Sequence, residues 1–113
     1  MNWIPLIHTS QLDTIKQDRQ PSLIFKHSTR CSVSAMAKRR FEQEWDCLPA
    51  ILNLYFLDLL SYRTLSSAVA DQFEVHHESP QLLLIKEGEC ILDASHGDIS
   101  ASEVAEVLIR LTS

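Results

Sequence analysis

The sequence has little glycine, no long apolar run and no leader-like beginning. Only 2 of its 113 residues are glycine and no low-complexity tract occurs, which predicts a compact globular chain. No apolar stretch approaches the roughly 18 to 20 residues of a membrane span. The first residues also lack the charged and apolar regions of a signal peptide. We therefore expect a cytoplasmic protein that does not bind membranes.

Basic residues are also too few for an electrostatic nucleic-acid binder. The chain has 10 Lys and Arg against 15 Asp and Glu, a formal net charge of -5. The cluster Lys38-Arg39-Arg40 is then one local patch, expected to be a solvated helix face. With 45% hydrophobic residues, the chain can bury a core without disulfides. We expect one domain over residues 1–113, and a monomer that does not bind nucleic acid.

The three cysteines offer neither a disulfide framework nor a zinc pattern. Cys31, Cys47 and Cys90 are odd in number and widely spaced, so we expect reduced thiols. The histidines add no pair at H-x-x-x-H spacing, and no metal site is expected. Cys47, near a helix end, and Cys90, at the start of a strand, are interpreted as small structural side chains.

Hydrophobic periodicity predicts helices and strands in the order αβαβαββα. Short apolar runs bounded by turn formers indicate strands, and longer runs with apolar residues every three to four positions indicate helices. The expected elements are helix 9–17, strand 23–28, helix 33–45, strand 50–58, helix 61–73, strands 82–86 and 90–94, and helix 100–111.

Several helix and turn details follow from the same patterns. Ser10 is the expected N-cap of the first helix, and Ser100 with Glu103 fits a capping box for the last. Glu87-Gly88-Glu89 is a hairpin signal between the last two strands. In the second helix, residues recurring every four positions are expected to face inward: Val33, Ala37, Phe41 and Trp45.

This order of elements predicts an α/β fold of the thioredoxin type. A strand-helix-strand unit with a right-handed parallel crossover, followed by a helix and an antiparallel hairpin, forms a mixed sheet. The predicted architecture is therefore a thioredoxin-like, mixed four-stranded sheet flanked by helices on both faces.

Cys31 stands at the predicted turn from the first strand into the second helix. Unpaired backbone N–H groups and the positive end of the helix dipole stabilise a thiolate there. Arg30, and Lys38 if the helix turns it that way, would add positive potential. Ser34 lies where many redox proteins place a second cysteine. It could donate a hydrogen bond to the sulfur, but it cannot resolve a disulfide formed at Cys31, which indicates monothiol chemistry.

Pro80 supplies a second signal, because it stands directly before a predicted strand. Thioredoxin-like proteins place a cis-proline there, facing the reactive cysteine, and X-Pro bonds tolerate the cis form. We expect a cis bond to turn the backbone of Ser79 toward Cys31. Its N–H and C=O could then pair with the backbone of a disulfide-bearing ligand.

These motifs together resemble a known family. Phe25-Lys26-His27-Ser28-x-Arg30-Cys31-x-x-Ser34, then His77-Glu78-Ser79-Pro80-Gln81, Gly88 and Ser95-His96 are similar to the monothiol bacilliredoxins (YtxJ type) of the bacillithiol system. The resemblance implies a thioredoxin-like protein that removes bacillithiol from S-bacillithiolated proteins. It implies that Cys31 is the nucleophile, that Ser34 replaces a resolving cysteine and that Pro80 is the cis-proline. Ser32 departs from the C-P-x-S form of the motif.

The expected catalytic residues are Cys31 and Ser34, and no bound cofactor is expected. Bacillithiol or a similar thiol is the expected co-substrate, and S-thiolated client proteins are the expected partners. A non-catalytic adaptor, a redox sensor in which Cys31 pairs with another cysteine, and a Cys-His hydrolase using His27 or His77 are the alternatives, the last without a recognisable signature. The expected substrate-binding residues are Thr29, Arg30, Ser32, Glu78, Ser79 and Pro80.

Overall fold

The structure is a computed structural model that describes residues 1–112. Each predicted helix and strand is present, with its ends shifted by up to three residues, and a short strand precedes them. The elements are β1 (Ile4–Pro5), α1 (Ser10–Gln17), β2 (Ser22–His27), α2 (Ser32–Glu44), η1 (Trp45–Cys47), β3 (Asn53–Asp58), α3 (Arg63–Phe73), β4 (Gln81–Lys86), β5 (Glu89–Ser95), η2 (His96–Asp98) and α4 (Ala101–Thr112).

The sheet has five strands in the order β1-β3-β2-β4-β5, one more than predicted. β1 and β2 run parallel to β3, whereas β4 is antiparallel to both β2 and β5. The additional strand, β1, pairs Ile4 with Tyr55 and Pro5 with Phe56, and the Leu6 N–H donates to the Phe56 carbonyl at 2.8 Å. Two residues that include a proline carry no periodicity, so the sequence gives no strand signal there.

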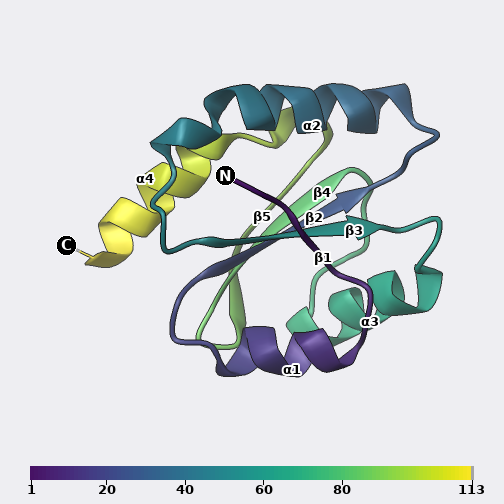
Figure 1. Ribbon diagram of the computed structural model, residues 1–113, viewed down its shortest axis with the longest axis horizontal. Helices are drawn as coiled ribbons and strands as arrows, with labels where there is room; N and C mark the ends of the chain where they lie inside the picture. Colours follow the sequence, from purple (N-terminus) through teal and green to yellow (C-terminus); the bar gives the residue numbers. More distant parts are fainter. Residues whose placement is uncertain (113) are drawn as a thin grey trace.

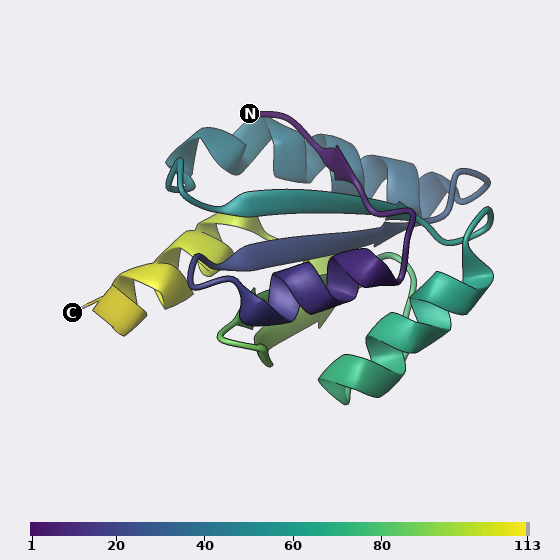
Figure 2. The same ribbon diagram turned by 60° about the horizontal axis from the view of Figure 1, so that its bottom comes forward.

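Helices cover both faces of the sheet, as predicted. α2 and α4 lie on one face, and α1 and α3 lie on the other (Figures 1 and 2). All six residues of β2 are buried, and they alternate between the two layers. Phe25 packs in the α2/α4 layer with Phe41, whereas Ile24 packs in the α1/α3 layer with Val69. This alternation decides which layer each polar residue at the end of β2 enters.

The inward face of α2 differs from the prediction by one residue. Val33 is 49% exposed, whereas Ser34 is fully buried in line with Ala37 and Phe41. A strict four-residue spacing turns by about 40° per step around a helix of 3.6 residues per turn, so it cannot stay on one face. The spacing from Ser34 to Ala37 to Phe41 alternates three and four and does stay there. A polar side chain thus points into the core one turn after Cys31.

The helix starts confirm one expected cap and correct another. Ser100 Oγ accepts a hydrogen bond from the Glu103 N–H at 3.3 Å, as half of the capping box requires. Ser10 is not the N-cap of α1; Thr9 is, and its side chain makes no capping bond. The side-chain Oε1 of Gln11 instead accepts hydrogen bonds from the N–H groups of residues 7 and 8, at 2.7 and 2.9 Å.

The predicted hairpin is confirmed, with Glu87 and Gly88 at its tip. Both residues have positive φ, 52° and 82°, which is the backbone of a type I′ turn. Glycine adopts this region without the steric cost that a side chain brings.

Replacing Ser100 by alanine is expected to lower the free energy of unfolding by about 1 kcal/mol, because the Glu103 N–H loses its capping oxygen. Urea unfolding followed by circular dichroism measures the change. Ser102→Ala is the matched control, since the Ser102 hydroxyl contacts only the Ser100 hydroxyl, at 2.8 Å. Equal losses in the two variants would contradict the capping role.

Candidate functional site

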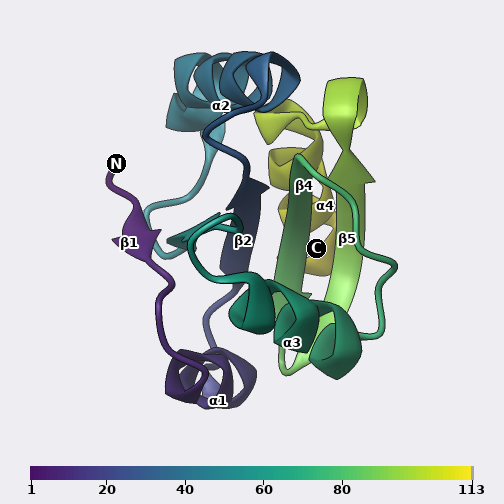
Figure 3. The same cartoon turned by 90° about the vertical axis from the view of Figure 1, so that its right-hand side faces the viewer.

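The loop after β2 and the loop before β4 meet where these two inner strands end, and this end of the sheet is called the reactive edge below. β2 and β4 are antiparallel neighbours with Lys26 opposite Gln81, so residues after His27 lie beside residues before Gln81 (Figure 3). Cys31 is in the first of these loops. The second contains the Ser79–Pro80 peptide bond, which is cis. The two sequence signals therefore come together at the same edge.

Cys31 occupies the N-cap position of α2 and is half-buried. Its N–H donates to the Ser28 carbonyl and its carbonyl accepts from the Ala35 N–H, both at 3.1 Å. Its thiol makes no capping hydrogen bond. The first N–H groups of an α-helix lack intrahelical partners, so unpaired donors lie beside this sulfur.

The predicted substrate-binding residues surround Cys31 on both loops. Thr29, Arg30 and Ser32 are exposed, Glu78 and Ser79 are half-buried, and Pro80 is buried. The Pro80 carbonyl accepts a hydrogen bond from the His96 N–H at 3.1 Å. Within residues 1–112, the backbone N–H and C=O of Ser79 have no hydrogen-bond partner. They are therefore available to a ligand backbone at this edge.

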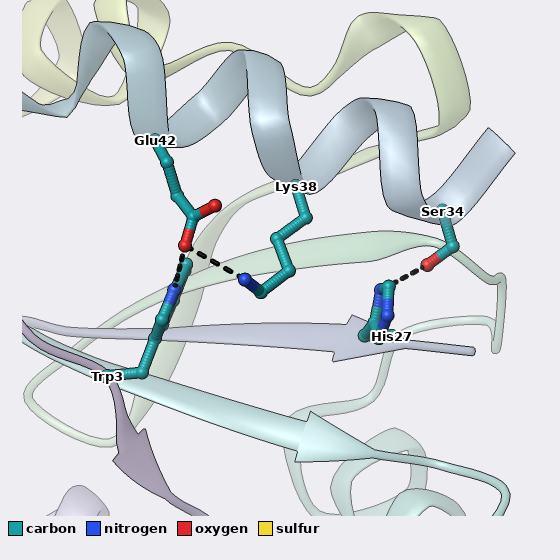
Figure 4. Close-up of polar contacts among 5 residues, drawn as sticks. All are labelled: Trp3, His27, Ser34, Lys38 and Glu42. Atoms are coloured by element: carbon teal, nitrogen blue, oxygen red, sulfur yellow. Dashed lines mark hydrogen bonds and ion pairs between the residues drawn. The ribbon is translucent and has the colours of Figure 1, made fainter. Parts of the chain in front are cut away.

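The Ser34 hydroxyl makes hydrogen bonds to His27 and to the loop that precedes Cys31, and not to the Cys31 sulfur. Its Oγ lies 2.7 Å from His27 Nδ1 (Figure 4). The same oxygen accepts a hydrogen bond from the Ser28 N–H at 3.1 Å. The expected hydrogen bond from Ser34 to Cys31 is not formed. The reason is geometric: Ser34 is on the inward face of α2, which turns its side chain toward β2. The hydroxyl thus ties the start of α2 to the end of β2.

The His27 ring is suited to accept a hydrogen bond from the Ser34 hydroxyl. Burial lowers its pKa below the usual value, and the nearby Lys38 charge lowers it further against the opposing influence of Asp58 and Glu42. The ring is therefore neutral at pH 7 and accepts at Nδ1. His27 also lies 5.2 Å, ring to ring, from Phe56, within the α2 layer.

The ammonium group of Lys38 does not lie at Cys31, where it was expected to add positive potential, because it pairs with Glu42. Its Nζ donates to Glu42 at 2.9 Å and lies 5.5 Å from the centre of the Phe56 ring. Trp3 Nε1 donates to the same Glu42 oxygen at 2.8 Å (Figure 4). Burial alone would raise the pKa of Glu42, but the hydrogen bonds from Lys38 and Trp3 outweigh it and hold the pKa below the usual value.

The basic cluster of α2 is only partly a solvated face. Arg39 is exposed, as expected. Arg40 is half-buried and donates to the carbonyls of His96 and Ile99, at 3.4 and 3.2 Å. Arg40 therefore connects α2 to the segment around η2.

A second polar group lies on the opposite face of the sheet, under the same edge. Lys26 is fully buried, and its Nζ donates to the Ser66 carbonyl at 3.2 Å and lies 3.2 Å from His77 Nδ1. Burial lowers the pKa of Lys26 from 10.5 to about 8. Burial and the Lys26 charge lower the pKa of His77. This group was not identified as a site from the sequence.

The two other cysteines differ from each other. Cys90 is half-buried, and its thiol contacts the Leu92 carbonyl at 3.4 Å. Burial and then the Asp93 charge raise its pKa to about 11, which makes it a poor nucleophile at neutral pH. Cys47 lies in η1 and is exposed, so it does not pack in the core as a small structural side chain would.

The part of the chain that the structure describes contains no group of three or more histidine, cysteine, aspartate or glutamate residues arranged to hold a metal ion. Within residues 1–112, every helix is too short or too polar to cross a membrane.

Comparisons with known proteins bear on the family and the fold of the chain. The sequence matches the family described as monothiol bacilliredoxin BrxC over residues 4–104. A solved structure of a proposed oxidoreductase with a thioredoxin fold is 30% identical, with a TM-score of 0.78 over 93% of this chain and 92% of that one. Thioredoxins from Halobacterium salinarum NRC-1 (a mutant form) and Malassezia sympodialis both give a TM-score of 0.72, at 16% and 18% identity. The aligned regions span 97% and 99% of this chain and 90% and 92% of the respective thioredoxin chains. The predicted thioredoxin-like fold is confirmed.

Proposed function

Since the chain belongs to the monothiol bacilliredoxin BrxC family, we propose that it removes bacillithiol, or a related low-molecular-weight thiol, from client proteins through Cys31. The family and its thioredoxin-fold neighbour support a thiol oxidoreductase. The observation that carries the proposal is the meeting of Cys31, at the start of α2, with the free Ser79 backbone at one edge of the sheet.

The proposed reaction is a single thiol-disulfide exchange. The Cys31 thiolate attacks the small-thiol sulfur of the mixed disulfide, and the client leaves as its thiolate. Cys31 then carries the small thiol as a disulfide. With Ser34 in place of a resolving cysteine, a second small thiol or a reductase attacks this adduct and frees Cys31.

Substrate contacts are assigned by position around the sulfur. The Ser79 N–H and C=O would pair with the backbone of the disulfide-bearing ligand, in the manner of a short added strand. Thr29, Arg30 and Ser32 would contact the substrate on the α2 side, and Glu78 on the β4 side. Pro80 shapes the loop that presents Ser79. We further propose that the protein acts as a monomer without a bound cofactor.

Intact-protein mass spectrometry tests the proposal. Reduced protein mixed with a bacillithiolated model protein is expected to gain one bacillithiol at Cys31 within minutes, with less adduct from a glutathionylated substrate. Cys31→Ala is expected to gain none. Cys47→Ser is the matched control: it removes the exposed second thiol and should leave the adduct unchanged. No adduct from either substrate would contradict the proposal and favour a non-catalytic adaptor.

A further inference from the structure

Lys26 is a buried cation without a carboxylate partner. It is 0% exposed, and Nζ contacts only the neutral groups of Ser66 and His77. Among residues 1–112, none of the ion pairs includes Lys26. A buried charge is costly unless it is paired, so an unpaired one requires an explanation.

A pocket of about 280 Å³ lies beside the groups that surround this lysine. Both residues that Lys26 contacts, Ser66 and His77, form part of the pocket wall, together with Leu59, Arg63 and Ser67. Arg63 is exposed and is the first residue of α3, where backbone N–H groups lack intrahelical partners. One positive side chain therefore lines a small hollow at a helix N-terminus, and the buried Lys26 lies behind the wall of that hollow.

The Ser66 hydroxyl is also unsatisfied. Ser66 is 4% exposed, and within the described chain its Oγ is buried without a hydrogen-bond partner. Buried hydroxyls are normally hydrogen-bonded, so this oxygen adds to the unsatisfied polar groups behind the pocket wall.

His77 presents a further donor. Because Lys26 donates to Nδ1, the neutral ring carries its proton on Nε2. Two acidic side chains lie on the flanking loops. The Asp58 oxygens accept from the Leu60 N–H and the Ser61 hydroxyl, and Glu78 lies 4.0 Å from His76 Nε2. The Glu78 charge opposes the lowering of the His77 pKa by burial and Lys26 without outweighing it. The polar side chains that line the pocket are hydrogen-bond donors, and Arg63 among them is a cation.

The pocket adjoins the reactive edge of the sheet. The N–H of Leu59 donates to the carbonyl of His27, four residues before Cys31. His77 stands two residues before Ser79, a separation that chain geometry limits to about 7 Å. A ligand in disulfide linkage with Cys31 and paired with the Ser79 backbone would thus lie beside the loop that carries His77.

We propose that this pocket binds a carboxylate of the small-thiol half of the mixed disulfide, with Arg63 and His77 contacting the anion and Lys26 balancing its charge. This inference rests on the proposed function. The small thiol, rather than the client, fits because the pocket is small and cationic. The exposed side chains on the α2 side of Cys31, Val33 and Met36, are apolar and suit a polypeptide.

The test uses two disulfides that differ in one group. A single-cysteine peptide is linked to mercaptopropionate or to mercaptopropionamide, which have the same length but carry a carboxylate or a neutral amide. The rate of Cys31 adduct formation is followed by mass spectrometry. The carboxylate probe is expected to react about tenfold faster, the size of one charge-assisted hydrogen bond. The net charge of -5 would produce the opposite preference.

Matched variants show which residues cause the faster reaction of the carboxylate probe. Lys26→Met and Arg63→Gln are expected to bring the rates of the two probes within about twofold of each other. Arg63 is exposed, so Arg63→Gln leaves the fold intact and tests the site without a change in the core. Lys86→Met, at the opposite end of β4, is expected to keep the full preference.

Three outcomes would overturn the inference. Equal rates for both probes in the unmodified protein, with Cys31 reacting, would refute the carboxylate site and leave the proposed function standing. A preference that Arg63→Gln does not change would place the anion elsewhere. If a glutamate in the peptide, rather than the small thiol, produced the acceleration, the carboxylate would come from the client. Failure of Cys31 to react with either probe would refute the proposed function itself.

Discussion

Replacing Lys26 by methionine is expected to raise the free energy of unfolding at pH 7 by about 2 kcal/mol. Burial lowers the pKa of Lys26 from 10.5 to about 8, which corresponds to about 3 kcal/mol of unfavourable charge burial at 1.36 kcal/mol per unit. Losing the contacts with Ser66 and His77 offsets about 1 kcal/mol of that gain. Methionine fills a similar volume without a charge. Urea unfolding of both proteins measures the difference.

The pH dependence of the free energy of unfolding provides a second check on this prediction. Because folding lowers the pKa of Lys26, the unfolded chain retains the proton to higher pH than the folded chain does. The stability of the unmodified protein therefore increases as pH rises from about 8 through 10.5, and the Lys26→Met protein lacks this contribution. The gap between them should nearly vanish at pH 10. The raised pKa of Cys90 acts in both proteins and cancels.

Two results would contradict this account of Lys26. One is a loss of stability in Lys26→Met at pH 7, which would mean that the lysine contributes net favourable contacts. The other is a similar gain in Lys86→Met, which is expected to change stability by less than about 0.5 kcal/mol. A confirmed gain would show that the chain keeps a destabilising lysine beside its reactive edge, as functional sites often do.

Replacing Ser34 by cysteine is expected to convert the monothiol site into a dithiol one. Residues three apart on a helix are neighbours, so the new thiol lies one turn from Cys31. It can attack the adduct, forming a disulfide between positions 31 and 34 and releasing the small thiol with its proton. In the mass experiment, the stable adduct should disappear, and the protein should instead be lighter by two hydrogen atoms.

Ser34→Ala separates the chemistry from the packing. Both substitutions remove the hydroxyl that His27 and the Ser28 N–H share, at a cost of about 1 to 2 kcal/mol in stability. Ser34→Ala has no thiol and should retain the adduct at Cys31. If the adduct persisted in Ser34→Cys as well, the buried position would not bring a thiol within reach of Cys31.

Sequence patterns predicted most of the fold because its elements follow regular periods. The apolar run at 23–28 predicted β2, and this strand is buried throughout because its side chains point alternately into the two helix layers. Gly88 predicted the hairpin. Pro80 and Cys31 were placed at the correct ends of their elements by local turn chemistry alone. β1 was missed because its pairing with β3 is a long-range contact that two residues cannot encode.

The polar contacts of the site could not be predicted in the same way. Ser34 and His27 are seven residues apart and meet only once β2 and α2 are packed. Lys26 and His77 are 51 residues apart and meet across two strands. A signal for Lys26 did exist: a lysine inside a strand expected to be buried must either be paired or carry a function.

The edges of the sheet also bear on how the protein behaves at high concentration. A long unpaired edge invites strands of other chains and leads to aggregation. On one side, β1 offers only two residues, and Pro5 has no N–H to donate. On the other, the register shift between Leu84 and Ile85 bends β5, and Asp93 places an exposed charge along it. Within the part of the chain that the structure describes, neither side therefore offers a flat template for intermolecular strand addition.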